Sequence, residues 1–441
     1  MSTERSGGAR VIVVGGGWSG LAAAWNLHRA GARPLLIDDR PTLGGRSATA
    51  HLGTRAITLG GKNIGRKYSR FRAFAAELGA GENAYEHFGI NSSRIEDGRL
   101  RTTDSTNKAA ALYGMLRGVP PRDLSRILRL AYYVRRDRAN AFLCGPDIER
   151  YAARTGDPTL SAFFGTRLRE RLLRPAVIRM NGAEPEESYL STLGTNLGML
   201  LDGFDQLTDG FDPLLHAFAA QVETRAATRV TALRVTAGRV TGVRALAPDG
   251  TASEEEADAV VLAVPAPHAA ALLRHHHDEL AQHLSRVRYF PVSVVVAEYD
   301  RPVFDTRIRA LTFPADSPLS NAGAYGVTDR HLVRYTFSGR AARTLPGDDE
   351  ELAALAERHL GAHLDLDAPK RLDMATARWR HGLCAYAPAH TRTLSAIDTL
   401  TAALPGLTLT GDYARGASIE ACVRAAEERT DRLLRQLGRP G

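Results

Sequence analysis

The 441-residue chain has little cysteine, little lysine and no long apolar segment. Its three cysteines, Cys144, Cys384 and Cys422, are odd in number and far apart. This pattern argues against a disulfide framework and a zinc site, and it favours a reducing, cytoplasmic location. The most apolar late stretch, residues 259–273, contains two prolines and a histidine and is too short to cross a bilayer. We therefore predict no transmembrane segment, although an amphipathic helix at a membrane surface stays open.

The positive charge of the chain is almost entirely arginine. A formal net charge of +8 arises from 53 arginines and 4 lysines against 49 acidic residues, and no tract of five or more basic residues occurs. Dispersed arginines do not indicate a nucleic-acid partner. The simplest functional explanation for the positive charge is a small-molecule substrate that is an anion. At 44% hydrophobic and 24% charged, the chain is otherwise ordinary for a globular protein, and it is long enough for two domains.

The N-terminal region carries a glycine-rich turn between two predicted strands. Residues 11–14 are typical of a buried strand, residues 20–31 have helical spacing, and residues 34–37 return to strand character. Gly15, Gly17 and Gly20 satisfy the pattern G-x-G-x-x-G at the first strand-to-helix junction. Glycine suits this turn because the backbone must bend sharply and approach a pyrophosphate more closely than a Cβ atom allows.

Three further segments indicate which dinucleotide is bound. Asp38 lies 18 residues beyond the last glycine of the pattern, where a carboxylate can accept hydrogen bonds from ribose hydroxyls. Residues 44–46, Gly-Gly-Arg, add a second pyrophosphate clasp. Near the C-terminus, Asp412 precedes a helix N-terminus capped at Ser418, whose dipole can stabilise negative charge on a reduced flavin.

The section from residue 107 to 180 predicts arginine-rich amphipathic helices. Leu124, Ile127, Leu128 and Ala131 recur there at the helical period. The arginines between them are typical of a solvated helix face.

The later chain is richer in strands. Residues 229–265 predict a β-meander, with turns at 237–238 and 249–250, that leads into a buried parallel strand. Another strand-rich section opens at Tyr289 and runs to about His390. The chain ends with a strand, a tight loop and a long helix. No internal repeat or low-complexity linker separates these sections, so we expect domains that interleave.

Residues 15–46, the strand "ADAVVLAVP" and the C-terminal "GLTLTGDYARGASIEACVRAA" together resemble the flavin-containing amine oxidase superfamily, which includes protoporphyrinogen oxidases and carotenoid-type desaturases. The resemblance implies an α/β fold: a Rossmann-type FAD-binding domain, built of a parallel sheet and a β-meander, with an inserted α+β substrate domain and a helical insertion. It places the FAD-binding domain at residues 1–90, 210–288 and 391–441. The substrate domain is expected at 91–209 and 289–390, with 107–180 largely helical.

Carried over residue by residue, the resemblance implies a set of FAD contacts. The pyrophosphate is held by Gly15, Gly17 and Gly20, and the adenosine ribose by Asp38. The phosphate and the flavin edge are contacted by Gly45 and Arg46, and the adenine by the backbone of Val230. Asp412 contacts the ribityl or pyrophosphate region, and Ile419 contacts the isoalloxazine.

Two departures from the simple amine oxidases bear on the substrate. Many of those enzymes carry a lysine in the strand that corresponds to residues 291–300, and this stretch has none. Many also have two tyrosines that form an aromatic cage, and the corresponding positions here are Leu383 and Ser418. Conversely, the stretch with Trp379, Tyr386 and His390 resembles protoporphyrinogen oxidases.

Several residues are candidates for the chemistry. His390 is the first candidate for a base or substrate contact because its ordinary pKa suits proton exchange near neutrality, but a histidine hydrogen-bonded under a loop is an equal alternative. Tyr386 is a further catalytic candidate, and Trp379 and Ser418 are expected to line the pocket. Lys62, close after a Gly-Gly turn, is another catalytic candidate.

Two apparent chemical motifs have simpler explanations. Cys384 lies near the place where some monoamine oxidases tether FAD, but it misses that position by two residues. We therefore expect a packed thiol and non-covalent FAD. His275, His276 and His277 point in different directions on a helix, so no metal site is predicted.

We predict an FAD-dependent oxidase or dehydrogenase that removes a hydride from a ring-containing biosynthetic intermediate to flavin N5, by CH–CH or CH–NH dehydrogenation. The alternatives are a simple amine oxidase that produces an imine and hydrogen peroxide, and a flavin-dependent mutase or isomerase without net redox. An escort protein for prenylated partners would lose part of the flavin signature, which is intact here. The electron acceptor is oxygen or another molecule, and a homodimer is compatible with the sequence.

Overall fold

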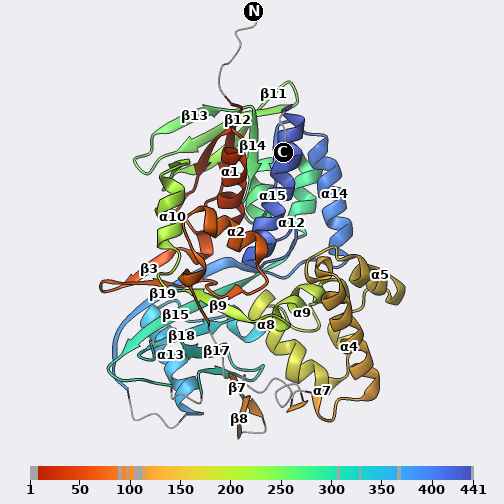
Figure 1. Cartoon of the computed structure of the whole chain (residues 1–441), viewed down its shortest axis with the longest axis vertical. Helices are drawn as coiled ribbons and strands as arrows, with labels where there is room; N and C mark the ends of the chain where they lie inside the picture. The colour runs from red at the N-terminus through yellow and green to blue at the C-terminus, as the bar shows by residue number, and fades with distance from the viewer. Residues whose placement is uncertain are drawn as a thin grey trace, which may run out of the picture.

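The computed structural model of the chain describes residues 8–87, 92–96, 99–103, 113–114, 116–304, 308–326, 329–364 and 369–438. Figure 1 shows a parallel sheet with its covering helices in the upper half, a second large sheet in the lower half, and a group of helices beside the second sheet. Across these ranges, no helix combines the length and apolarity needed to span a membrane.

The N-terminal unit is a strand, a helix and a parallel strand, which confirms the predicted βαβ unit. β1 (Arg10–Val14) pairs in parallel with β2 (Arg33–Ile37), and α1 (Trp18–Arg29) connects them. All but the first residue of each strand are buried, because helices cover both faces of the sheet. The helix begins two residues earlier than predicted, at Trp18.

The parallel sheet collects strands from three distant parts of the chain. Its order is β10-β2-β1-β14-β20, with β10 (Glu223–Arg225), β14 (Ala259–Leu262) and β20 (Leu407–Leu409). All four strand pairs are parallel. The C-terminal helix α15 (Ile419–Gln436) packs against α1 on one face of this sheet (Figure 1).

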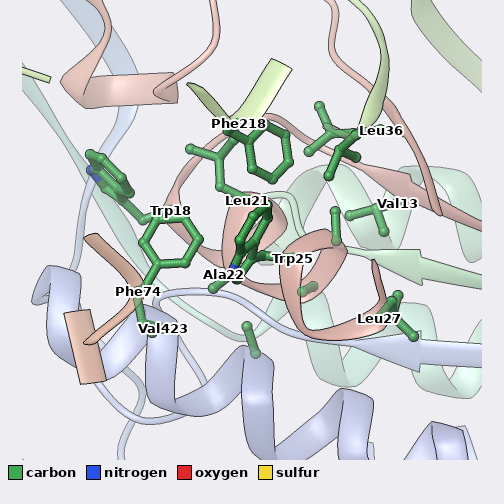
Figure 2. Packing of buried hydrophobic residues seen from close by; sticks show 14 of the residues in the cluster. Val13, Trp18, Leu21, Ala22, Trp25, Leu27, Leu36, Phe74, Phe218 and Val423 are labelled. Carbon is green, nitrogen blue, oxygen red and sulfur yellow. The ribbon is translucent and has the colours of Figure 1, made fainter. Parts of the chain in front are cut away.

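Aromatic side chains fill the core between α1 and its neighbours. Figure 2 shows Trp18, Leu21 and Trp25 of α1 among Phe74, Phe218 and other members of this cluster. The Trp18 ring meets Phe71 edge-on at a centroid distance of 5.2 Å, a geometry that adds roughly 0.5–1.5 kcal/mol beyond the buried area. This packing fixes the N-terminus of α1 relative to the sheet.

The predicted meander is present and joins the parallel sheet as expected. β11 (Arg229–Thr236), β12 (Arg239–Leu246) and β13 (Ala252–Glu256) form an antiparallel sheet in that order. Ala237 and Gly238 both have positive φ, 47° and 74°, which gives the tight first turn. The chain then enters β14 of the parallel sheet.

The second large sheet has seven strands in the order β19-β15-β18-β17-β16-β7-β8. They are β7 (Ser92–Glu96), β8 (Arg99–Thr103), β15 (Tyr289–Tyr299), β16 (Ala310–Thr312), β17 (Leu319–Ala324), β18 (Leu332–Phe337) and β19 (Arg371–Cys384). Helix α13 (Asp349–Gly361) packs on one face. The strand predicted at Tyr289 is confirmed.

The helical section confirms the predicted period but not the predicted buried face. α4 (Pro121–Arg136) buries Ile127, Leu130 and Val134, whereas Leu128 is 51% exposed. The face toward α9 (Leu193–Leu200) therefore runs through Ile127 and Leu130, and Leu128 projects about 100° away from it. The expected helical residues 107–112 and 115 lie outside the described residues.

The other helices and strands complete the two halves of the molecule. They are β3 (Thr49–Leu52), β4 (Arg55–Thr58), β5 (Ile64–Gly65), α2 (Ser69–Glu77), β6 (Tyr85–His87), α5 (Pro146–Thr155), α6 (Leu160–Phe163), α7 (Thr166–Leu168), α8 (Arg174–Asn181), β9 (Phe204–Leu207), α10 (Asp212–Ala219), α11 (Ala266–Leu273), α12 (Asp278–Ser285) and α14 (His390–Ala402). A π-helix, η4 (Arg169–Leu173), and short 3₁₀ turns η1 (Gly45–Ser47), η2 (Glu82–Ala84), η3 (Arg138–Ala141), η5 (Leu190–Thr192) and η6 (Arg340–Arg343) lie between them.

These sheets are built from the chain segments that the domain prediction assigns to them. The strands of the parallel sheet come from three segments, 10–37, 223–262 and 407–409. The strands of the second sheet come from two segments, 92–103 and 289–384. The domain boundaries at residues 90, 210, 288 and 390 stay a prediction, because shared sheets do not mark where one domain ends.

Candidate active site

The glycine pattern forms an open cradle at the start of α1. Gly15 has φ +108°, and a Cβ atom on Gly20 would lie 1.7 Å from the Gly15 carbonyl oxygen, so neither tolerates a side chain. A Cβ atom on Gly17 would meet nothing closer than the Cα of Gly45, at 4.0 Å. The N-cap of α1 has no side-chain hydrogen bond and its first turn holds no acidic residue. Free N–H groups at a helix N-terminus with open space above them suit a phosphate.

Asp38 lies at the carboxyl end of β2, beside this cradle. Its side chain is 8% exposed and accepts the Gly16 N–H at 2.5 Å and the Arg40 N–H at 2.9 Å. Burial raises the pKa of Asp38, while the two backbone N–H groups oppose that shift. The neighbouring Asp39 is exposed. The structure therefore places Asp38, and not Asp39, against the glycine cradle.

The meander reaches the same edge of the sheet. The Thr228 N–H donates to the Asp38 carbonyl oxygen at 2.8 Å, and the Ala227 N–H donates to that of Arg40. Val230 follows two residues later in β11 and is half-buried. This pairing places the predicted adenine contact next to the predicted ribose contact.

The second glycine pair brings Arg46 toward the C-terminal segment. Gly44 and Gly45 have positive φ, +101° and +57°, which directs the chain into the short turn η1. Arg46 donates to the Gly382 carbonyl oxygen and to the Asp412 carboxylate, both at 2.7 Å. The Asp412 side chain is 1% exposed, so this ion pair is largely shielded from water.

The C-terminal segment completes this region. Tyr289 donates a hydrogen bond to the second oxygen of Asp412. Ser418 caps α15 by accepting the Ala421 N–H at 3.2 Å, as predicted from the sequence. Ile419 is the first residue of that helix and packs against the same core as α1. The segments at residues 15–20, 38, 44–46 and 412–419, which are distant in the sequence, thus converge, and their free helix N-terminus, carboxylate and arginine fit FAD.

A cavity of about 540 Å³ lies beyond these contacts. On one side it is lined by Gly60, Gly61, Tyr386 and residues 416–418, and on the other by residues of β16, β17, β18 and α8. A Cβ atom on Gly60 would lie 1.6 Å from the Arg46 carbonyl oxygen, so the Gly60–Gly61 turn packs directly on the second clasp. The cavity therefore joins the predicted FAD-binding elements to the second sheet.

Tyr386, a predicted catalytic candidate, and Ser418, a predicted pocket residue, both line this cavity. The Tyr386 hydroxyl accepts the Ala417 N–H at 3.0 Å, which holds the turn before Ser418 in place. Tyr386 has a positive φ of 63°, a conformation that non-glycine residues adopt mainly where the surrounding structure requires it. Burial raises the pKa of Tyr386 well above its ordinary value, so the hydroxyl stays protonated.

Lys62 also lines the cavity, on the loop that follows β4. Its Nζ lies 3.4 Å from the centroid of the Tyr325 ring and donates to the Tyr325 carbonyl oxygen and, at 3.3 Å, to Gln206. Burial, followed by repulsion from Arg334, lowers the pKa of Lys62 well below its ordinary value. This shift favours the neutral amine, which can accept a proton.

The geometry does not support the expectation that His390 is a base. His390 is 1% exposed and does not line the described cavity. Its Nδ1 accepts the Ala387 N–H at 3.3 Å and its Nε2–H donates to the Tyr413 carbonyl oxygen at 2.8 Å. Burial lowers the pKa of His390 to about 4. Both ring nitrogens are used to hold the loop before α14, which is the alternative that the sequence left open.

Trp379 also lies away from the cavity. It is opposite Val292 in the β15–β19 pairing and packs with the apolar residues on that face of the sheet. The expectation that it lines the pocket is therefore not supported.

Sequence reasoning missed the positively charged wall of the cavity. Arg179 of α8, Arg309 before β16 and Arg334 of β18 all line it, and so does Tyr325. The arginines are separated by 130 and 25 residues in the chain, and no local spacing connects them. One signal was available: Arg334 alternates with apolar residues in a strand, which is unusual for a charged side chain in a buried sheet.

The cysteines and the histidine run lie apart from one another in the fold. Cys144, Cys384 and Cys422 are free thiols, and Cys384 is completely buried. His275 and His276 are exposed between α11 and α12, and His277 caps α12. Among the described residues no group of three or more histidine, cysteine, aspartate or glutamate side chains could hold a metal ion.

Comparisons with known proteins agree with this arrangement. The family model for flavin containing amine oxidoreductases matches residues 18–434. Coproporphyrinogen III oxidase of Mycobacterium leprae is 26% identical over 473 residues, which cover 97% of this chain and 98% of that protein. A proposed protoporphyrinogen oxidase of an Exiguobacterium species has a similar structure, with a TM-score of 0.70 and 18% identity over 99% of this chain and 100% of its own. The structure of cyclohexylamine oxidase from Brevibacterium oxydans is also similar, with a TM-score of 0.72 and 17% sequence identity. That match covers 98% of this chain and 100% of the oxidase chain. At these identities the solved structures show a shared fold.

Proposed function

The chain belongs to the flavin containing amine oxidoreductase family and is an FAD-dependent oxidoreductase; we propose that its substrate is a ring-containing biosynthetic intermediate, dehydrogenated at a CH–CH or CH–NH bond. The family match confirms the predicted resemblance, fold class and cofactor. The observation that carries the proposal is the cavity of about 540 Å³ between the FAD-binding segments and the second sheet. This volume suits a multi-atom ring system.

The full-length relative supports the same substrate class. A protein named coproporphyrinogen III oxidase matches 97% of this chain and 98% of its own length. At 26% identity this likeness supports oxidation of a ring system only loosely. The absence of a lysine from residues 291–300 and the presence of Leu383 at a cage position further distinguish this chain from simple amine oxidases.

The roles of individual residues in binding FAD are part of the proposal. The N-terminus of α1 with Gly15, Gly17 and Gly20 would hold the pyrophosphate, and Asp38 the ribose. Gly45 with Arg46 and the Asp412–Ile419 segment would bind the flavin half, and Val230 the adenine. Bound there, FAD supplies the acceptor for a hydride from the substrate carbon. We further propose non-covalent FAD, because burial raises the pKa of the Cys384 thiol well above its ordinary value and keeps it unreactive.

Lys62 replaces His390 as the proposed proton acceptor. Its amine lines the cavity and its pKa is low, whereas His390 lies outside the cavity with both nitrogens engaged. With FAD bound as the hydride acceptor, the Lys62 amine would accept the neighbouring N–H or C–H proton, and the product would carry a C=N or C=C bond. Tyr386 acts as a positioning residue that holds the turn at residues 416–418.

An anaerobic screen tests the proposal. The yellow holoenzyme is mixed with porphyrinogens, polycyclic biosynthetic intermediates and simple amines, and bleaching of the flavin absorbance is followed before oxygen is admitted. Bleaching by a ring-containing class, with a desaturated product, is expected. Bleaching by simple amines alone would establish the amine oxidase alternative, and turnover to an isomer without lasting bleaching would establish the mutase alternative. The rate of recovery in oxygen distinguishes an oxidase from a dehydrogenase.

Two further expectations remain open to direct measurement. Three free cysteines are compatible with a reducing cytoplasm, and fractionation of the source cells tests that location. The mass of the holoenzyme in solution tests whether the chain forms a homodimer, which the sequence left open.

A further inference from the structure

Basic side chains from three separate parts of the fold line one cavity. Arg179 projects from α8, Arg334 from β18, and Lys62 from the loop after β4. Arg334 is fixed in place because it donates to the carbonyl oxygens of Gly60 at 2.7 Å and Thr58 at 3.3 Å. Arg179 retains exposed surface in the cavity.

The two arginines have little charge compensation from the protein. Within the described part of the chain, no carboxylate lies within 4.0 Å of the Arg179 or Arg334 guanidinium, and Arg179 has no hydrogen-bond acceptor. Asp202, the acidic residue of the cavity wall, already accepts the N–H groups of Gly203 and Lys67. By contrast, Arg415 of the same wall is paired with Glu428 at 2.8 Å.

Neighbouring charges respond to this imbalance. Burial lowers the pKa of Arg179, and burial together with repulsion from Arg179 lowers the pKa of Arg334 to about 10. Like charges held close together repel each other, and an anion bound between them would relieve that repulsion. Arg174, in the same helix as Arg179, does have such partners, Glu170 and Glu184. The cavity thus presents two guanidinium groups that lack a carboxylate partner in the described chain and can take one from a ligand.

We propose that Arg179 and Arg334 form an anion subsite that binds carboxylate or phosphate groups of the substrate. The planar N–H forks of two arginines suit such oxyanions and reject a protonated amine. The inference rests on the proposed function and specifies its substrate as an organic anion. The opposite wall, formed by Gly61, Tyr386 and Ser418, lies toward the FAD-binding segments. The substrate ring would lie on that side while its anionic groups face α8 and β18.

Equilibrium titration of the yellow holoenzyme tests this subsite without turnover. The probes are isophthalate, its neutral analogue isophthalamide, phenyl phosphate and the cation benzylamine, and binding is measured by calorimetry and by perturbation of the flavin spectrum. We expect isophthalate or phenyl phosphate to bind at least tenfold more tightly than isophthalamide. Comparison of these two anions identifies carboxylate or phosphate as the preferred group.

Arginine variants locate the anion. Arg179→Gln removes a side chain without a hydrogen-bond partner in the described chain, so it should fold normally, and it should weaken anion binding about 10- to 100-fold, the loss expected for a charged hydrogen bond. Binding of isophthalamide should not change. The control Arg122→Gln removes an equal charge from an exposed position of α4 and should leave both affinities unchanged. Arg334→Gln should act like Arg179→Gln if its urea midpoint stays near that of the wild type.

Three results would overturn the subsite. They are equal affinity of the wild type for isophthalate and isophthalamide, tighter binding of benzylamine than of both anions, and unchanged anion binding in Arg179→Gln. A holoenzyme that binds none of the anions would also overturn it. Failure of the proposed function would look different: no ring-containing compound would bleach the flavin, whatever the anion affinities are.

Discussion

Alanine at Gly17 and at Gly20 should separate cofactor binding from folding. At Gly20 the new Cβ atom would lie 1.7 Å from the Gly15 carbonyl oxygen, so β1 and α1 must move apart by more than 1 Å. Overpacking of this kind costs about 1–3 kcal/mol of stability. At Gly17 the nearest atom is 4.0 Å away, and its φ of −79° and ψ of 177° are open to alanine. Gly17→Ala should therefore change the stability of the apoprotein by only about 0.5 kcal/mol.

The two variants should therefore be affected in different properties. Gly20→Ala should mainly lose stability, and Gly17→Ala should mainly lose affinity for FAD. The Gly17 Cβ atom enters the gap toward Gly45, which is the space proposed for the pyrophosphate. Loss of one charged hydrogen bond there would weaken FAD binding about tenfold or more. Urea unfolding of the apoproteins and FAD titration by protein fluorescence measure the two effects. A Gly17→Ala protein that binds FAD like the wild type, or a Gly20→Ala apoprotein as stable as the wild type, would refute the assignment of the cradle.

The remaining predictions concern three ionisable side chains. Asp38→Ala should weaken FAD binding about tenfold in the same titration, since it removes the proposed ribose acceptor; exposed Asp39→Ala is the control and should bind normally. Lys62→Met should slow anaerobic flavin reduction by about 100-fold or more and remove the rise of the rate with pH as the amine deprotonates, whereas Lys67→Met should do neither. The pKa of His390 falls to about 4 on folding from an ordinary value of 6.5, so the unfolded chain binds the extra proton and stability should drop as the pH is lowered from 6.5 to 4, by up to about 3 kcal/mol. Urea unfolding across that range should show this slope in the wild type and a smaller one in His390→Gln; equal slopes would contradict a buried neutral histidine.

Local patterns in the sequence predicted the elements that depend on neighbouring residues. The first strand, helix and strand follow from an apolar run, helical spacing and the glycine turn, and all three are present. The turn at Ala237 and Gly238 was predictable because two residues with positive φ are needed between paired strands. Ser418 was recognisable as a helix cap from its place before an apolar helical pattern.

Features that depend on distant neighbours were not predictable in the same way. The pattern in α4 indicates a helix, but which side faces the core is decided by the position of α9, and so Leu128 is exposed. His390 has the side-chain chemistry of a base, yet the carbonyl oxygen of Tyr413, 23 residues away, fixes its role. Arg179 and Arg334 become one site only through the contact of α8 with the second sheet.

The contrast between Arg46 and Arg179 shows how the two ends of the site differ in purpose. Arg46 already has the Asp412 carboxylate at 2.7 Å, so its charge is balanced in the folded chain before any ligand binds. An arginine that is already paired with a carboxylate gains only a little binding free energy from a phosphate. That is sufficient for a cofactor that many backbone contacts hold at the same time. Arg179 has no such partner in the described chain, so an arriving anion gains its full attraction. If Arg46 binds FAD and Arg179 binds the substrate as proposed, arginine serves in both places, and charge balance separates the resident dinucleotide site from the site that selects its ligand by charge.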